Sequence, residues 1–288
     1  MIDLWFAVIA FLWTGYFVLE GFDFGVGLLA PFISKNEREH QQALQTIGPV
    51  WDGNEVWLIT AVGAMFAAFP AWYAGMFSTF YLPVVLVLVG LIVRGVGLEW
   101  RSKLASPRLA DLGIVVGSAL PAFLWGAIFA DVLRLNPILG GLFSLAVSVL
   151  HGAVFLTLKT TGDVRRRARV AALGASAVVV PLGAVALSSI GSAPALVAMA
   201  ALAAAVALVW RRREGWAFAA TAGAIVLTSV SVFWTLRTTP LPGLTLAEAA
   251  SGPYTLNVLT WIGLAVLPFV MVYQGWTYWV FRKRIAVA

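Results

Sequence analysis

Cysteine is absent from this chain of 288 residues, and charged residues make up only 11% of it. The first absence excludes disulfides, iron–sulfur ligation and thiolate chemistry. The second sets the chain apart from ordinary soluble domains, in which roughly 25% of residues are charged. Histidine is also scarce: His40 and His151 are the two, which is a thin supply for binding haem or a metal ion.

Hydrophobic residues are abundant, at 61% of the chain with a mean hydropathy of +0.92. Apolar stretches of about 18 or more residues recur from end to end, and each is long enough to cross a bilayer as a helix. We therefore expect an all-α polytopic membrane protein, with residues 1–288 forming a single integral membrane domain. Nine spans are predicted, at 4–33, 54–75, 77–100, 109–133, 137–158, 169–190, 194–210, 215–236 and 255–281. The first span is too long for a signal-peptide core and follows no basic region, so we expect it to be retained.

Lys and Arg are distributed unevenly between the two sets of loops. Of the 19, sixteen lie in the loops after the first, third, fifth and seventh spans and at the C-terminus. Because cytoplasmic loops are enriched in Lys and Arg, we expect the N-terminus outside and the C-terminal "FRKR" in the cytoplasm. The runs "RRRAR" and "WRRRE" are interpreted as topology anchors, and no nucleic-acid partner is expected despite the net charge of +6.

The loops are short and contain no separate soluble domain. The polar, helix-favouring "KNEREHQQALQTI" after the first span predicts a surface helix. The sixth and seventh spans are joined by "GSAP" and form either a hairpin or one kinked element. The sequence contains no convincing internal repeat, which counts against a transporter, since many transporters carry inverted repeats.

Acidic residues occur inside the first span. An ionisable group in the hydrocarbon region costs about 2.5–3.5 kcal/mol on insertion scales and therefore indicates function. In "LEGFDFGVG", Glu20 and Asp23 are three residues apart and share a helix face. The neighbouring Gly21, Gly25 and Gly27 allow another helix to pack closely. We interpret the acids as a proton-accepting pair in a hydrated crevice; the alternative is a helix end that reaches the membrane interface.

The stretch "GPVWDGNEVW" places two further acids, Asp52 and Glu55, at the start of the second span. Their spacing suits a capping box at a helix N-terminus, and it equally suits a proton relay. Trp51 and Trp57 beside them have the character of interfacial aromatic residues. If the first two spans form an antiparallel hairpin, Asp23 and Asp52 can approach each other. Two carboxylates at low dielectric do not both ionise readily, which suits the transfer of protons.

Two basic side chains complete the set of polar residues within the spans. Arg94 lies inside the third span, and a buried Arg requires a carboxylate or a bound anion as its partner. Pairing with an acid of the first two spans is the favoured interpretation. His151, in "SVLHGAVF", could ligate haem, relay protons or bond a backbone carbonyl. Haem ligation would usually need a second strong axial ligand, and few are present.

These segments resemble subunit II of the cytochrome bd-type quinol oxidases. The resemblance rests on "GFDFGVGLL", "WDGNEVWLITAVGAMFAAFP", "FYLPVVLVLVGLIVRGVGLEWRSK" and "TLNVLTWIGLAVLPFVMVYQGWTYW". It is close over the first third of the chain, good over the last span and looser between them. The WDGNEVWL block together with GFDFGVG is specific to that family.

The resemblance implies more than the composition does. It implies a fold of two four-helix bundles plus one peripheral helix, in the cytoplasmic membrane of a bacterium or archaeon. The complex would oxidise quinol and reduce oxygen to water without copper, with two haems b and haem d held by subunit I. This chain would hold no haem, no metal and no catalytic residue. Its partners would be subunit I, small single-helix subunits, quinol and membrane lipid.

The resemblance also implies roles for individual residues. The Asp of GFDFG is Asp23 and the Asp of WDGN is Asp52, and both would belong to a proton-uptake pathway from the cytoplasm, with Glu20 as a third member. The supporting residues are then Glu55, Arg94, Trp51, Asn54 and Trp57. The alternatives are a stand-alone proton-coupled transporter built on the same embedded charges, or a membrane scaffold whose acids only cap helices.

Overall fold

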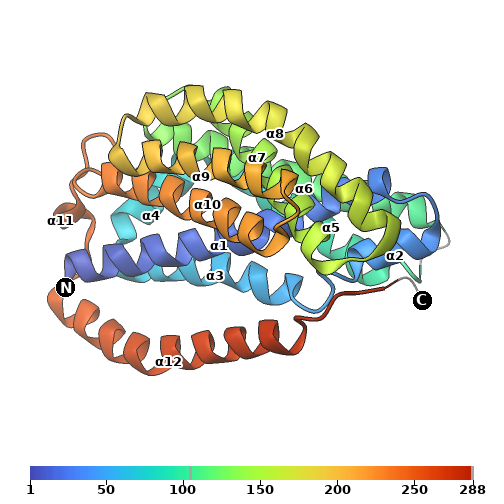
Figure 1. The fold of residues 1–288 in the computed structure, drawn as a ribbon. Helices are drawn as coiled ribbons and strands as arrows, with labels where there is room; N and C mark the ends of the chain where they lie inside the picture. Colours follow the sequence, from blue (N-terminus) through green and yellow to red (C-terminus); the bar gives the residue numbers. More distant parts are fainter. Residues whose placement is uncertain (104–105, 287–288) are drawn as a thin grey trace.

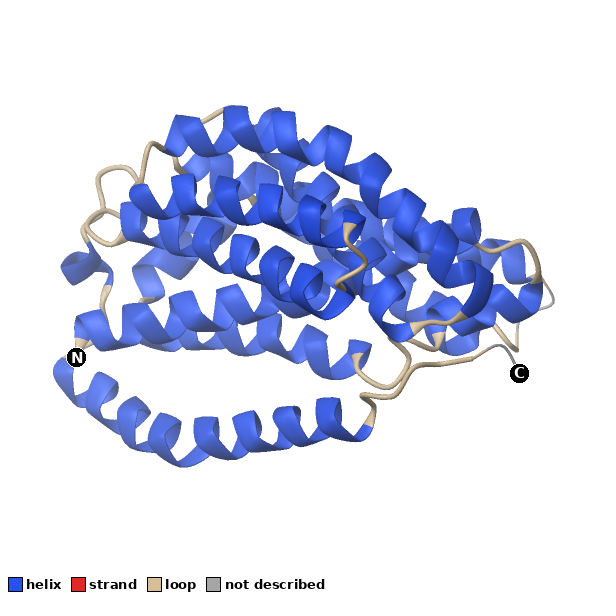
Figure 2. Ribbon diagram, in the orientation of Figure 1, coloured by secondary structure: helices blue, strands red, loops and turns tan. Residues whose placement is uncertain are grey.

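The computed structural model describes residues 1–103 and 106–286, and these are folded almost entirely into helices (Figures 1 and 2). In chain order the helices are α1 (Ile2–Ile33), α2 (Glu37–Leu44), α3 (Trp51–Ala68), α4 (Pro70–Thr79), α5 (Tyr81–Trp100), α6 (Pro107–Val132), α7 (Pro137–Lys159), α8 (Gly162–Ile190), α9 (Ala193–Trp210), α10 (Glu214–Leu236), α11 (Leu246–Ala249) and α12 (Pro253–Val280). Among the described residues, eight helices are long and apolar enough to cross a membrane: α1, α5, α6, α7, α8, α9, α10 and α12. The predicted all-helical, multi-pass membrane fold is confirmed.

The segment predicted as the second span is divided between two helices. Pro70 lacks a backbone N–H and disfavours a helical conformation for the residue before it. Phe69 accordingly leaves the helical region, with φ −136° and ψ 66°, and α3 ends there before α4 begins. α3 is not among the eight apolar helices, since Asp52, Asn54 and Glu55 lie in its first two turns. The ninth membrane span therefore stays a prediction.

Two local expectations are confirmed and one boundary differs. The polar segment after α1 forms the helix α2, and α8 and α9 form a hairpin. Gly191 turns the chain between them in the left-handed conformation, with φ +65°. α8 begins at Gly162, well before the predicted start at residue 169, because the charged run of "GDVRRRARV" continues the helix beyond its apolar part.

α1 lies among the other helices and packs against α3, α6, α7 and α10 (Figure 1). Its contact with α7 is made by glycines on both sides. A Cβ added at Gly25 would lie 2.0 Å from the Ser148 carbonyl oxygen, and one at Gly152 would lie 2.4 Å from the Gly25 carbonyl carbon. Small residues thus bring the two backbones into direct contact. The part of α1 that carries Glu20 and Asp23 is consequently enclosed by protein.

α12 is the peripheral helix and runs along the outside of the bundle (Figure 1). Leu256 is its buried residue, and most of its large side chains are exposed. Near its start, Trp5 Nε1 donates to Thr260 Oγ1 at 3.0 Å. Beyond its other end, the Ile285 N–H donates to the Lys159 carbonyl at 2.8 Å. α12 is therefore held mainly near its ends, and its long apolar face is left to lipid or to another protein.

We expect Gly152→Ala to destabilise the protein by about 1–3 kcal/mol, because the added methyl group would overlap the α1 backbone. Gly174→Ala in α8 is the matched control: no other atom lies within 4 Å of a Cβ added there. It should be neutral or stabilise the helix by about 0.5–1 kcal/mol. The measurement is the thermal unfolding midpoint of the two purified variants. Equal midpoints would contradict the close α1–α7 contact.

Candidate functional site: a buried arginine with three carboxylates

Three helices converge on the guanidinium of Arg94, which projects from α5. Arg94 Nη1 donates to Glu20 Oε2 of α1 at 2.8 Å and to Glu55 Oε1 of α3 at 3.1 Å. Its Nη2 lies 3.9 Å from Asp23 Oδ2 of α1. The structure thus brings Arg94 together with three acids of the predicted site. The prediction that Arg94 pairs with acids of the first two spans is confirmed.

This cluster is fully buried except at Glu55. The side chains of Glu20, Asp23 and Arg94 are fully enclosed, whereas 24% of the Glu55 side chain is exposed. One guanidinium can neutralise one carboxylate, so three ionised acids would leave two negative charges in excess. Buried charge without a partner is strongly unfavourable. The cluster is therefore suited to taking up protons, and Glu55 connects it to the surface.

Close helix packing places the guanidinium. A Cβ added at Gly117 of α6 would lie 2.7 Å from Arg94 Cβ, so only glycine lets α6 pack at this depth. On the other side, the Arg94 guanidinium lies 5.0 Å from the ring centroid of Phe24, a cation–π contact. Phe24 directly follows Asp23 on α1. Arg94 is thus packed against α6 at its Cβ and against an aromatic ring at its guanidinium.

Asn54 links Asp23 to the peripheral helix. Its Nδ2 donates to Asp23 Oδ2 at 2.7 Å, and its Oδ1 accepts from Gln274 Nε2 at 3.1 Å and from Tyr278 OH at 2.8 Å. Gln274 and Tyr278 are not among the site residues predicted from the sequence. A signal was present, because the two polar residues are four apart in "YQGWTY" and so share one face of an otherwise apolar helix.

Asp52, Trp57 and the N-terminus of α3 differ from what the sequence "GPVWDGNEVW" predicts. Asp52 is exposed, and its side chain makes no hydrogen bond or ion pair with another described residue. α3 begins at Trp51 with Val50 as its N-cap and has no side-chain cap, so the capping box is not formed. Trp57 is buried, and its ring lies where a Cβ of Gly15 would be, at 2.1 Å. It is a packing residue between α3 and α1 rather than an interfacial aromatic.

His151 has both ring nitrogens occupied by protein. Nδ1 lies 2.7 Å from Thr221 Oγ1, and Nε2 lies 3.2 Å from the Val18 carbonyl oxygen. Its ring stacks on Phe218 with the centroids 4.7 Å apart. Neither nitrogen is available to a metal ion in this arrangement. Of the three interpretations of His151, bonding to a backbone carbonyl is the one that the geometry matches.

An apolar cavity of about 190 Å³ lies between α1, α6, α7 and α10. Trp125, Phe129 and Phe143 are among the large side chains that line it. It contains no member of the Arg94 cluster, and its lining offers no ionisable side chain. Its walls therefore give a proton no group to bind.

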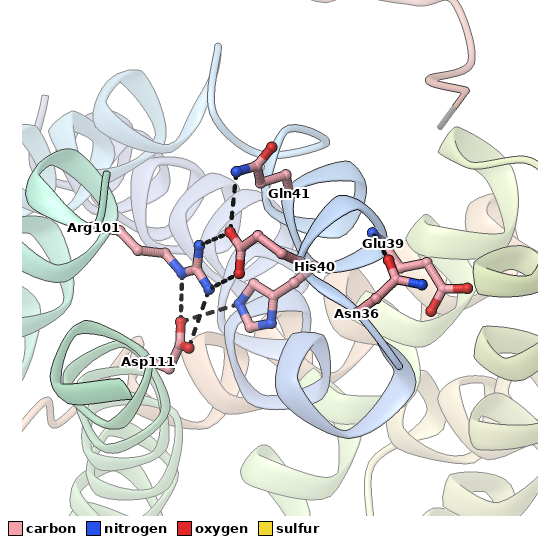
Figure 3. A network of polar contacts seen from close by, with 7 residues as sticks. Asn36, Glu39, His40, Gln41, Arg101 and Asp111 are labelled. Atoms are coloured by element: carbon pink, nitrogen blue, oxygen red, sulfur yellow. Dashed lines mark hydrogen bonds and ion pairs between the residues drawn. The ribbon is translucent and has the colours of Figure 1, made fainter. Parts of the chain in front are cut away.

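A second polar network fixes α2 to the neighbouring helices (Figure 3). Arg101, which follows α5, donates from Nε to Asp111 Oδ1 of α6 at 2.6 Å and from Nη2 to Glu37 Oε2 of α2 at 3.0 Å. His40 Nε2 lies 3.1 Å from the same Asp111 oxygen. On the other side of α2, Arg167 Nη2 donates to Glu39 Oε2 at 2.5 Å. Arg101 contacts both oxygens of Asp111 and both oxygens of Glu37, and two-pronged Arg–carboxylate contacts are strong.

The charges of α2 are shifted by these contacts. The hydrogen bond from Arg101 lowers the pKa of Glu37, and the hydrogen bond from Arg167 lowers the pKa of Glu39. Burial lowers the pKa of His40, against the opposing effect of Asp111. Each of these three groups therefore favours the folded position of α2 when it is in its unprotonated form.

Comparison with known proteins identifies the family. The model of the family "Cytochrome bd terminal oxidase subunit II" matches residues 1–281. The chain belongs to this family. The resemblance carried by GFDFGVG and WDGNEVWL is thereby confirmed.

Curated members of the bd oxidase subunit II family are similar to the chain over nearly their whole length. It is 38% identical over 327 residues to the cytochrome bd ubiquinol oxidase subunit 2 of Bacillus subtilis (strain 168), covering 99% of this chain and 96% of the relative. It is 30% identical over 357 residues to the cytochrome bd-I ubiquinol oxidase subunit 2 of Escherichia coli (strain K12), covering 98% and 94%. A chain of the bd oxidase structure from Geobacillus thermodenitrificans has the same fold, with a TM-score of 0.72 at 16% identity, covering 98% and 99%.

We expect Arg94→Gln to destabilise this subunit by about 3–5 kcal/mol, because removing one partner leaves buried carboxylates without a counter-charge. The double variant Glu20→Gln/Arg94→Gln removes one acid as well and should recover part of that loss. The measurement is the thermal unfolding midpoint of each purified variant. A double variant no more stable than Arg94→Gln alone would contradict the pairing of these two residues.

We also expect α2 to loosen as the pH falls. Below about 6.5, the usual pKa of histidine, unfolded α2 binds a proton at His40 that the folded helix excludes, so stability is lost as the pH drops. Glu37 and Glu39 extend the loss below about 4.3, the usual pKa of glutamate. Amide hydrogen exchange of the α2 peptide, corrected for the intrinsic pH dependence, should show less protection at about pH 5.5 than at about pH 7.5. His40→Gln should abolish the difference between these two pH values.

Proposed function

We propose that this chain is the haem-free subunit II of a cytochrome bd-type oxidase that oxidises quinol and reduces oxygen to water. The relatives named as subunit 2 of bd ubiquinol oxidases extend over almost the whole chain, which supports this activity for the complex. We infer a haem-bearing subunit I as the partner, in the cytoplasmic membrane of a bacterium or archaeon. The exposed apolar surface of α12 and of the other outer helices is available to subunit I, single-helix subunits and lipid.

We infer that the end of the bundle that carries α2 faces the cytoplasm. The basic loops gather there: Arg101 and Arg167 both contact α2, and the segment after α12 pairs with the Lys159 carbonyl. The N-terminus and α11 lie at the opposite end (Figure 1). The enrichment of Lys and Arg in cytoplasmic loops supports this orientation.

The function of the subunit within the complex would be proton uptake through the Arg94 cluster. The observation that carries this proposal is one buried guanidinium facing three carboxylates, of which Glu55 reaches the surface. Asp52 is exposed three residues before Glu55 on α3, so it is placed to collect protons for Glu55. From Glu55 the Arg94 contact leads to Glu20 and Asp23 in the interior.

Each residue has a distinct role in this pathway. Asp52 and Glu55 would receive protons from the cytoplasmic side, and Glu20 and Asp23 would hold them inside the protein. Arg94 would keep the acids close together and limit how much negative charge accumulates among them. Trp51 and Trp57 would support the first turns of α3, where Trp57 packs against Gly15 of α1.

We expect Asp23→Asn, in the complex assembled with subunit I, to slow oxygen consumption about tenfold or more, because an amide cannot carry a proton between acids. Asp52→Asn should slow it as well, by a smaller factor, since water can reach Glu55 directly. The measurement is the oxygen consumption rate with quinol, at unchanged haem content of the complex. Glu99→Gln, which removes an exposed acid at the end of α5, is the control and should have no effect.

Wild-type turnover of Asp23→Asn with full haem content would refute the proton pathway. The competing function, a stand-alone proton-coupled transporter, predicts a different result. In that case the chain purified alone would move a solute across liposomes, and no haem-bearing subunit would co-purify with it.

A further inference from the structure

The side chain of Asn54 is fully buried and has a partner at each polar atom. Two donors from α12, the Gln274 amide and the Tyr278 hydroxyl, bond its Oδ1 at 3.1 and 2.8 Å. Its Nδ2 donates to Asp23 Oδ2 at 2.7 Å. An asparagine amide is nearly symmetrical in shape, so its hydrogen-bond partners decide which end faces which group.

Those partners favour this orientation of Asn54 whether or not Asp23 is ionised. An ionised Asp23 accepts from Nδ2 and so selects this orientation by itself. After Asp23 binds a proton, a free amide could turn its oxygen toward the carboxyl group. The two α12 groups at Oδ1 oppose that rotation, because both hydrogen bonds would survive it only if the Gln274 amide also turned over and the Tyr278 hydroxyl changed from donor to acceptor. Asn54 is therefore biased toward presenting a donor to Asp23 in both states.

The two oxygens of Asp23 are consequently not equivalent. Oδ2 faces the Asn54 donor and lies 3.9 Å from Arg94 Nη2. Oδ1 is buried and has no hydrogen-bond partner among the residues that the structure describes. An oxygen that already faces a donor cannot also place its own proton in that direction. The unoccupied oxygen, Oδ1, is the one left to accept a proton.

Apart from their hydrogen bonds to Asn54, Gln274 and Tyr278 have little reason to be polar. Gln274 and Tyr278 are one helical turn apart on a helix whose large side chains are mostly exposed and apolar. The charged and titratable groups around Asp23 are Glu20 on its own helix, Glu55 on α3, Arg94 on α5 and Tyr278 on α12. Of these, Tyr278 contacts Asp23 through Asn54.

We propose that Gln274 and Tyr278 are positioning residues of the proton pathway. Through Asn54 they hold Asp23 Oδ2 in a hydrogen bond and leave Oδ1 as the oxygen that binds the proton. This inference rests on the proposed role of Asp23 in proton uptake. It adds a contribution from the peripheral helix, which carries no acid of its own.

The test uses the double variant Gln274→Leu/Tyr278→Phe in the complex with subunit I. Infrared difference spectra identify the bands of Asp23 as those lost in Asp23→Asn. We expect these bands to shift in the double variant, and oxygen consumption to fall about two- to tenfold, the equivalent of one neutral hydrogen bond. Tyr273→Phe is the matched control, because this tyrosine lies on the same helix with 58% of its surface exposed.

Unshifted Asp23 bands in a fully assembled double variant would overturn the inference, as would an equal shift in Tyr273→Phe. If the double variant does not assemble, Tyr278→Phe alone, which removes one hydroxyl group, is read by the same two criteria. Failure of the proposed function gives a different pattern. Asp23→Asn would then turn over at the wild-type rate, while the band shift would still report the positioning of Asp23.

Discussion

The buried guanidinium of Arg94 is the constraint on which the interior of this subunit depends. A charge at zero exposure requires opposite charge within contact distance, so α1, α3 and α5 must converge on one point. Their convergence requires small residues elsewhere. Gly117 lets α6 pack beside Arg94, and Gly25 with Gly152 lets α7 pack beside α1. The packing around Arg94 thus depends on glycine at position 117.

The number of acids separates this cluster from an ordinary structural ion pair. Arg101, at the α2 end of the bundle, also faces two carboxylates, but Glu37 is 54% exposed and neither carboxylate is fully enclosed. Arg94 faces three, of which Glu20 and Asp23 are fully enclosed. A purely structural role would need one carboxylate, since each further buried acid adds unfavourable desolvation. The proposed function accounts for the two additional acids at Arg94 as groups that bind and release protons, whereas the contacts of Arg101 hold α2.

Local spacing was enough to predict part of this site. The three-residue interval of Glu20 and Asp23, and the isolation of Arg94 in an apolar run, required only helical periodicity and the unfavourable energy of buried charge. The different exposure and contacts of Asp52 and Glu55 could not be predicted in this way, because they depend on where α3 begins and how it is rotated against α1. The hydrogen bond from Tyr278 to Asn54 joins two residues that are 224 positions apart in the chain. Tertiary packing, which no local pattern encodes, decides both.

The hydrogen bonds between α12 and Asn54 are important because α12 is the peripheral helix. A helix held mainly near its ends keeps its place only if its apolar face is covered, since exposed hydrophobic surface of this extent is unfavourable in water. Lipid or a neighbouring protein must supply that cover, and it thereby acts on the position of the whole helix. Gln274 and Tyr278 of this helix donate hydrogen bonds to Asn54, and Asn54 donates one to Asp23. Asp23 is therefore linked through hydrogen bonds to the helix against which lipid or a neighbouring protein packs.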